Sequence, residues 1–255
     1  MNQDITNFLD LLWEMSIKEL KARYKHTIFG LFWLIVNPLL QMIVIGFVFR
    51  FFMKSSIPNY NYYLFLGLLM WNFFSTSLTK TVSSIVSERS LIKKAKFSHA
   101  VIPLSIILSN FIQLIAAFVL FIIPVIFLNT LNTWSLPTTL LAFILLLAFT
   151  GGISLLLSAL NVRFRDVNFF VQAILIVWFY ATPIIYSINI IPFEFIWLWR
   201  LNPMVSILQL FQSGILSFPM PESAILTLNI IIIVVVLIAG ISIFKRESNF
   251  FDDWL

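Results

Sequence analysis

The chain has 255 residues, of which 60% are hydrophobic and only 11% charged, and its mean hydropathy is +1.00. A soluble globular domain carries about 25% charged residues, so this composition excludes a water-soluble globule and also a disordered chain. The 16 Lys and Arg residues outnumber the 11 Asp and Glu residues, which in an apolar chain indicates basic cytoplasmic loops rather than nucleic-acid binding. The sequence therefore predicts an all-α polytopic membrane protein.

Several classes of chemistry lack the residues they need. The chain has no cysteine and only two histidines, His26 and His99, which excludes disulfides, thiolate catalysis and a histidine metal cluster. It contains no P-loop, no H-E-x-x-H and no G-x-S-x-G pattern. The predicted membrane cores contain no carboxylate, which disfavours an ion-driven secondary transporter. We expect no catalytic residue, no metal and no cofactor on this chain.

Residues 1–27 predict an amphipathic helix. Apolar residues recur there at helical spacing: Ile5, Phe8, Leu9, Leu12, Ile17 and Leu20. Charged residues form the opposite face: Asp10, Glu14, Lys18, Lys21 and Lys25. Such a helix lies along a membrane surface rather than crossing the bilayer. The alternative is a helix that packs on a partner protein.

The remaining stretch, 28–255, predicts a domain of six membrane-spanning helices, each with the roughly 20 apolar residues that a bilayer requires. The expected spans are 28–52, 62–84, 100–128, 136–160, 168–187 and 224–244. With the N-terminus inside, all of the 16 Lys and Arg residues fall on the cytoplasmic side except Arg50, Lys54 and Arg200. This asymmetry predicts that both termini are cytoplasmic.

Two connections between spans are unusual. The cytoplasmic loop 87–99 is short and basic, yet Leu91, Ile92 and Phe97 are apolar, which favours docking of a partner protein over a purely orienting role. The external segment 188–223 is rich in aromatic residues and proline. Because so much aromatic surface would seek cover, we expect short re-entrant helices that dip into the outer leaflet.

Polar residues form a stripe along the second predicted span. They recur every three or four residues: Asn72, Ser75, Thr76, Thr79 and Ser83. Lys80 lies near the cytoplasmic end of the same span. A polar stripe facing lipid is costly, so it either hydrogen-bonds other helices or lines a water-filled path. In the fourth span, the small residues Gly151, Ser154 and Ser158 predict a close approach between helices.

Aromatic residues make up 16% of the chain. Trp and Tyr near the ends of membrane spans are typical interface anchors. The alternative is a stacking surface for sugar rings, whose apolar C–H faces suit aromatic platforms.

Short motifs in a fixed order make the chain recognisable. They are Lys18-Glu-Leu-Lys-Ala-Arg-Tyr-Lys25, Gly30-Leu-Phe-Trp33, Asn37-Pro38, Leu91-Ile-Lys-Lys94, Pro103-Leu104, Asn161-Val-Arg-Phe-Arg-Asp166, Thr182-Pro-Ile-Ile-Tyr186 and Leu201-Asn-Pro203. Together they resemble the membrane subunit of bacterial ATP-binding-cassette exporters of polysaccharides, the class that moves O-antigen, capsule and teichoic acid. The chain departs from the usual pattern at Ser98-His99, where a proline is common. It also has Gln209 and Gln212 near the place of a frequent arginine.

The resemblance implies an inner-membrane homodimer with two copies of a separate ATPase subunit, which carries ATP and Mg²⁺, and a glycan path between the protomers. It implies that 5–24 is an interface helix, 88–97 a coupling helix in a cleft of the ATPase, and 192–216 the paired external helices. The substrate is then a lipid-linked polysaccharide, with O-antigen as the first choice, and membrane lipid is a further partner.

These implications give four sets of expected site residues. Coupling to the ATPase is expected from Glu88, Arg89, Leu91, Ile92, Lys93, Lys94 and Phe97. The substrate path is expected along Trp33, Trp71, Asn72, Thr76, Thr79, Trp178 and Tyr180. The lipid head group is expected to enter at Lys18, Lys21, Arg23 and Lys25. An exit constriction is expected at Trp197, Trp199, Asn202 and Pro203.

Two other functions fit the same topology. A drug or lipid exporter of the same superfamily would have a predominantly apolar cavity instead of an aromatic-lined tunnel. An ATP-independent channel or structural membrane protein would need no ATPase partner, and the apolar residues in the cytoplasmic loop argue against it.

Overall fold

The computed structural model describes residues 2–25, 32–52, 57–94, 97–127, 135–192, 194–216 and 218–254. Within these ranges the chain forms helices and no strand, which confirms the expected all-helical class. The α-helices are α1 (Asn2–Tyr24), α2 (Trp33–Phe52), α3 (Tyr60–Ser87), α4 (Arg89–Lys94), α5 (Val101–Phe127), α6 (Leu136–Arg163), α7 (Asp166–Tyr180), α8 (Ile196–Arg200), α9 (Pro203–Leu216), α10 (Ser223–Glu247) and α11 (Phe251–Trp254). The described ranges also contain two short 3₁₀ helices, Ile188–Ile190 and Ser248–Phe250.

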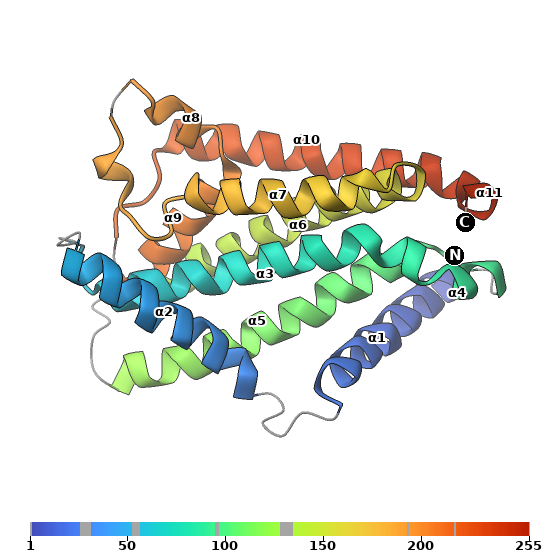
Figure 1. Ribbon diagram of the computed structural model, residues 1–255, viewed down its shortest axis with the longest axis horizontal. Coiled ribbons are helices and arrows are strands. Elements are labelled where there is room, and N and C mark those ends of the chain that lie inside the picture. Colours follow the sequence, from blue (N-terminus) through green and yellow to red (C-terminus); the bar gives the residue numbers. More distant parts are fainter. Residues whose placement is uncertain are drawn as a thin grey trace.

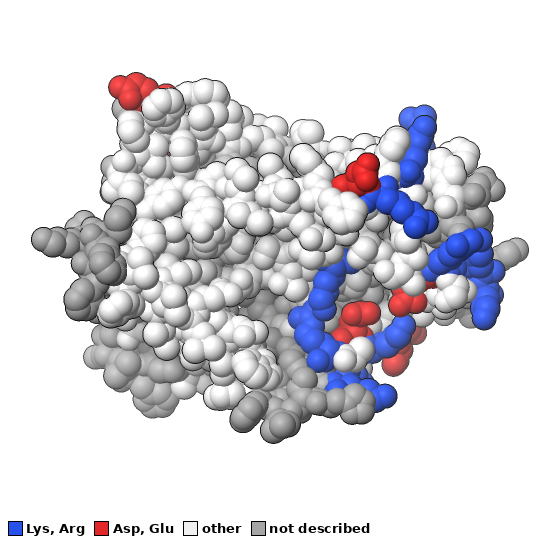
Figure 2. Space-filling model, viewed as in Figure 1, with Lys and Arg blue, Asp and Glu red and all other residues white. Residues whose placement is uncertain are grey.

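The long helices lie along the long axis of the molecule (Figure 1). Both termini, α1, α4 and α11 gather at one end, and α8 and α9 lie at the other. On the face seen in Figure 2, Lys and Arg gather toward the end that holds the termini, which we call the basic end. Away from the basic end, that face is almost entirely uncharged, apart from an acidic group at the opposite end.

Three helical stretches are long and apolar enough to cross a membrane: Val101–Ile123, Leu136–Arg163 and Ser223–Phe250. Val36–Phe49, Asp166–Tyr180 and Pro203–Leu216 are apolar but shorter. The first span predicted, 28–52, begins in residues outside the described ranges. The fifth differs from its predicted 168–187, because α7 ends at Tyr180 and an irregular turn follows. The count of six spans therefore stays a prediction.

Helix α3 lies at the centre of the fold, in contact with α2, α5, α6, α7 and α9. Its apolar face is fully buried, with Leu64, Leu66 and Phe74 at 0% exposure. At its start, the Tyr63 hydroxyl donates to the carbonyls of Pro183 (2.7 Å) and Tyr186 (2.9 Å). These bonds fix the turn after α7 against α3, so α3 sets the position of that turn and of the end of α7.

Helices α6 and α10 meet at two glycines. A Cβ added at Gly152 would lie 2.7 Å from the Cα of Leu237, and one at Gly240 would overlap the carbonyl oxygen of Gly152. The predicted close approach of this span is present, and its buried residues Ser154 and Ser158 fit it. Yet a Cβ at Gly151 would meet nothing within 4 Å. The contact therefore depends on Gly152 and not on Gly151.

We predict that Gly152→Ala destabilises the protein by roughly 1–3 kcal/mol, because the new methyl group meets backbone atoms that cannot rotate away. Gly151→Ala is the matched control, and it should leave stability unchanged or slightly raised by the better helix propensity of alanine. The thermal unfolding of the two variants, purified in detergent and compared with the natural chain, measures the difference. Equal melting temperatures for both variants would contradict the assigned contact.

Candidate functional site

The polar stripe of α3 lies on a face that the rest of the chain leaves open. Asn72, Thr76 and Ser83 are half-buried and Thr79 is exposed. Asn72 and Thr76 line a cavity of about 550 Å³. Thr79 and Ser83 line a neighbouring cavity of about 300 Å³. Lys80 lines both, so the two cavities adjoin, and we call them together the α3 groove.

Among the described residues, few hydrogen bonds involve the side chains of this stripe. Asn72 donates its side-chain amide to Gln41 of α2, at 3.1 Å between Nδ2 and Oε1. The Thr79 hydroxyl donates to the carbonyl of Ser75 in its own helix. The stripe therefore both contacts α2 and lines the two cavities, and its role as a substrate path stays a prediction.

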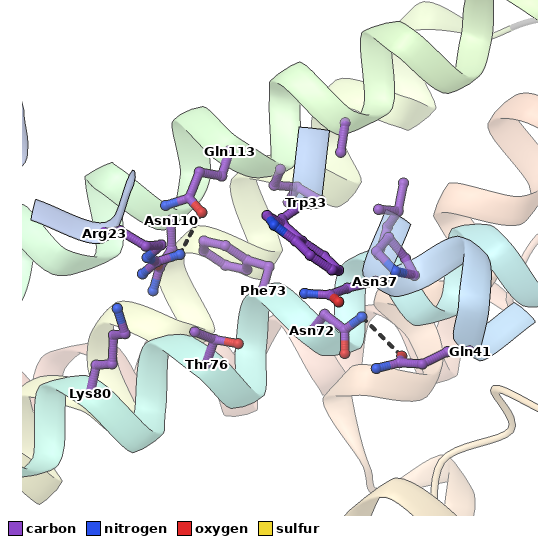
Figure 3. A pocket seen from close by; sticks show the side chains of 14 residues that line it. Arg23, Trp33, Asn37, Gln41, Asn72, Phe73, Thr76, Lys80, Asn110 and Gln113 are labelled. Carbon is purple, nitrogen blue, oxygen red and sulfur yellow. Dashed lines mark hydrogen bonds between the residues drawn. The ribbon is translucent and has the colours of Figure 1, made fainter. Parts of the chain in front are cut away.

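The larger cavity has walls from four helices (Figure 3). Helix α2 contributes Trp33, Asn37 and Gln41, and α5 contributes Asn110 and Gln113. Sequence analysis did not identify Asn37, Gln41, Asn110 or Gln113 as site residues. The signal for the α5 pair was available, since a Gln and an Asn three residues apart are unusual in so apolar a span.

Arg23 closes one end of this cavity from α1. Its guanidinium donates to Oδ1 of Asn110 at 2.6 Å and also to Oε1 of Gln113. Asn110 in turn donates to the Ser77 hydroxyl of α3 at 2.9 Å. The Nε of Arg23 is buried and has no hydrogen-bond partner. Arg23 thus ties α1 to the bundle through neutral amides.

The four basic residues at which the head group was expected to enter lie in two different places. Lys18, Lys21 and Lys25 line an open face of α1 together with Glu14. Arg23 points instead into the cavity with Lys80, as Figure 3 shows. A helix places residues i and i+2 on different faces, which accounts for the separation of Arg23 from Lys21 and Lys25.

The expected path residues fall in several places. Trp33, Asn72 and Thr76 line the larger cavity, and Thr79 lines the smaller one. Trp71 is 6% exposed and packs its ring on Phe74 and Phe179, with centroids 5.6 and 5.5 Å away. Tyr180 is exposed at the end of α7. The geometry does not bring these two to the α3 groove.

Trp178 lies with the residues of the expected exit constriction. It lines a cavity of about 440 Å³ together with Trp199, Asn202 and Pro203. Asn202 Oδ1 accepts hydrogen bonds from Trp178 Nε1 and the Met204 amide, both at 3.1 Å. Trp199 Nε1 donates to the Tyr186 hydroxyl at 2.9 Å, which fixes α8 to the turn after α7.

Trp197, the remaining residue of the expected exit constriction, lies on α8 and is 55% exposed. Asn202 also donates its amide to the Thr182 hydroxyl at 3.1 Å. The Asn-Pro motif therefore has a local structural role, because it joins the end of α7 to the start of α9.

The coupling segment 88–97 presents charge to solvent and apolar groups to the protein. Ile92 is buried, and Leu91 and Phe97 pack on the same apolar cluster. The chain itself buries Ile92, whereas Leu91 and Phe97 stay partly exposed, so docking of a partner at this loop stays a prediction. The exposed charged residues of the segment are basic: Arg89, Lys93 and Lys94. Residues 95–96 of the segment lie outside the described ranges.

Glu88 begins the segment and contacts α1. Its Oε1 lies 3.4 Å from Nζ of Lys18, with side-chain exposures of 30% and 59%. An ion pair this exposed contributes little to stability. It does place the start of the coupling segment directly against α1.

The C-terminal helix α11 packs on the same apolar cluster as the coupling segment. Sequence analysis did not identify this contact. Phe251 is 0% exposed and belongs to the apolar cluster that contains Ile92. Its ring lies 5.8 Å from that of His99 and 5.6 Å from that of Phe244. The guanidinium of Arg163 lies over the ring of Trp254, with its Cζ atom 5.5 Å from the ring centroid. This packing joins α4, α6, α10 and α11 at the basic end.

Comparisons with known proteins converge on one family. Residues 10–216 match the family described as ABC-2 type transporter. The O-antigen export system permease protein RfbA of Klebsiella pneumoniae is 34% identical over 263 residues, covering 100% of this chain and 98% of the relative. The protein of that name from Myxococcus xanthus is 32% identical over 253 residues, at 98% and 97% coverage. The polysialic acid transport protein KpsM of Escherichia coli is 20% identical over 248 residues, at 92% coverage of each chain.

We predict that Phe251→Ala destabilises the protein by about 3–5 kcal/mol, because it removes a buried ring from the cluster at the basic end. The neighbouring Phe250 is 46% exposed. Phe250→Ala is therefore the matched control, and its effect should stay within about 0.5 kcal/mol. Thermal unfolding of the purified variants provides the comparison. Similar stability of Phe251→Ala and the natural chain would contradict the proposed support of the coupling segment.

Proposed function

This chain belongs to the ABC-2 type transporter family, and we propose that it is the transmembrane subunit of an ATP-driven exporter that carries O-antigen polysaccharide across the bacterial inner membrane. The observation that carries this proposal is the similarity over the full length to permeases named for O-antigen export. The chain has no P-loop of its own. We therefore assign ATP and Mg²⁺ to a separate ATPase subunit, with two copies of each chain in the complex.

The coupling segment is the part of the chain proposed to contact the ATPase. Its exposed charged side chains are basic and its apolar side chains pack into the chain. We therefore expect the docking surface of the ATPase to be acidic, because complementary charge guides association and fixes orientation. Movement of the ATPase would be transmitted through Ile92, since that side chain is anchored in the cluster that joins α1, α3, α6 and α10.

The α3 groove is the part proposed to carry the polymer. It is open along one side in the single chain, so a second copy facing it would complete a tunnel between protomers. Its lining offers hydroxyls, amides and the Trp33 ring. Such groups bind a sugar chain weakly at many points, which permits sliding, because tight binding at one site would halt conduction. The Trp178 cavity lies beside α8 and α9, where the polymer would leave.

The open face of α1 is proposed to attract the lipid-linked substrate. Lys18 and Lys21 are exposed there, and Lys25 extends the same face. Basic residues near the cytoplasmic surface are attracted to anionic lipid head groups over about a Debye length. Substrate would therefore be concentrated at the side of the molecule on which the α3 groove begins.

Depletion of the protein in its native cell tests the function directly. We expect lipid-linked glycan to accumulate on the cytoplasmic face of the inner membrane while its synthesis continues. Glycan is located by its accessibility to an added glycosidase in intact and in opened spheroplasts. Surface glycan at normal levels, in a strain shown to lack a second exporter, would refute the proposal.

We also predict that Glu88→Lys and Arg89→Glu each lower export at least about tenfold while the protein stays inserted at normal levels, because Arg89→Glu reverses a charge on the proposed docking surface and Glu88→Lys replaces the ion pair with Lys18 by repulsion. Lys245→Glu, an exposed charge reversal on α10, is the control and should keep normal export. Export per copy is measured from surface glycan and membrane abundance. Undiminished export by the Glu88 and Arg89 variants would contradict the coupling assignment.

A further inference from the structure

We propose that the larger cavity of the α3 groove is a binding site for a phosphate or diphosphate group, held between Arg23 of α1 and Lys80 of α3, with the amides of α5 beside them. This inference rests on the proposed function and assigns the anionic part of the substrate to particular residues. It places that group inside the groove and not on the open lysine face of α1.

The first argument is the charge of the cavity. Arg23 and Lys80 are both half-buried and line the same cavity, and none of the described residues that line it is acidic. The nearby carboxylate whose charge acts on Lys80 is Glu19, which lines only the adjacent cavity. No described carboxylate lies within ion-pair distance of either cation. Bringing two cations together out of water is costly, and a bound anion removes that cost.

The second argument is the hydrogen bonding of Arg23. Its terminal nitrogens donate to the neutral oxygens of Asn110 and Gln113, whereas its Nε is buried without a partner. A guanidinium bonds an anionic oxygen about twice as strongly as a neutral one, and its fork matches the spacing of two phosphate oxygens. A phosphate in the cavity would therefore compete with these amide oxygens for the terminal nitrogens of Arg23.

The third argument is the shape of the site. Lys80 faces Arg23 from the opposite wall, so the donors converge on one end of the cavity (Figure 3). A tetrahedral group, with oxygens on all sides, can contact both walls, whereas a planar carboxylate presents its oxygens to one. Away from these cations the lining includes the amides of Asn37, Gln41 and Asn72 (Figure 3), and Leu69, Leu114 and Ala117 also contribute to it. A cavity that offers cations, amides and apolar side chains suits a phosphate attached to a larger amphipathic molecule.

The open lysine face of α1 lacks these features. Lys18, Lys21 and Lys25 are exposed and come from α1 and the residue just after it. Charges in water are screened by salt over about 10 Å or less, so they attract anions without holding one in place. We assign attraction to that face and binding to the pair of Arg23 and Lys80.

The test measures binding to the full chain, without an ATPase, in nanodiscs of uncharged phosphatidylcholine. The probes are farnesyl diphosphate, inorganic diphosphate and farnesol, followed by isothermal titration calorimetry. We expect Arg23→Gln and Lys80→Gln each to weaken farnesyl diphosphate binding about tenfold or more, because each removes a charged hydrogen-bond donor. Arg246→Gln, on the exposed end of α10, is the control and should bind as the natural chain does.

A further variant separates loss of the site from loss of the fold. Asn110→Asp keeps and strengthens the bond to Arg23, so α1 stays attached, but its carboxylate neutralises the cavity. We expect this variant to unfold at the same or a higher temperature and to lose diphosphate binding. Conversely, Lys80→Arg keeps the charge and should retain most of the affinity, whereas Arg23→Lys keeps the charge but loses the guanidinium fork and should weaken binding.

The outcomes divide clearly. Binding of both diphosphates that depends on Arg23 and Lys80 supports the site. Tighter binding of farnesyl diphosphate than of inorganic diphosphate identifies a lipid-linked source, and equal binding identifies a free one. The proposal is overturned if farnesol binds as tightly as farnesyl diphosphate, if Asn110→Asp keeps full affinity, or if Lys21→Gln loses as much affinity as Arg23→Gln.

These outcomes are independent of export. If depletion traps glycan in the cytoplasm but the variants bind normally, the exporter assignment stands and the anion site falls. If the variants lose binding while depletion leaves surface glycan normal, the anion site stands and the exporter assignment falls.

Discussion

The fold depends on one constraint, that a helix at the centre of an apolar bundle carries a polar face. Backbone and side-chain polar groups within a membrane need partners, because lipid supplies none. Helix α3 meets this constraint by burying its apolar face against α5, α6, α7 and α9 and turning its polar face toward α1, α2 and the groove. The groove is thus a consequence of where α3 can place Asn72, Thr76 and Lys80.

The same constraint explains the position of α1. A surface helix is held by its apolar residues, and Met15 indeed belongs to the cluster at the basic end. Near its other end, however, the contact with the bundle is made by the Arg23 guanidinium with two amides of α5. Because those partners are neutral, the attachment is weaker there than an ion pair of similar geometry would be. An anion that bound Arg23 would compete with this attachment, so substrate and helix position are linked.

Sequence alone predicted what periodicity and composition determine. The apolar runs located the helices, and three- and four-residue spacing located the polar face of α3, because both are properties of one helix. Sequence did not predict that Ile92 faces inward, that the Arg23 side of α1 and not the Lys21 side faces the bundle, or that Phe251 fills a core. Each of these depends on which neighbour packs there, and neighbours distant in sequence leave no periodic signal. The contact between Gly152 and Gly240 also depends on a distant neighbour, because nothing in the local sequence distinguishes Gly151 from Gly152.

The packing at the basic end suggests how movement at the coupling segment reaches the groove. Ile92 shares one cluster with Met15 of α1 and Ile85 of α3, and the ion pair of Lys18 with Glu88 joins the start of the segment to α1. Packed interiors resist compression, so a displacement of α4 moves the helices that contact it rather than being absorbed. Both cations of the proposed anion site lie on those two helices. A push on the coupling segment would therefore change the separation of Arg23 from Lys80, and with it the affinity for the group between them.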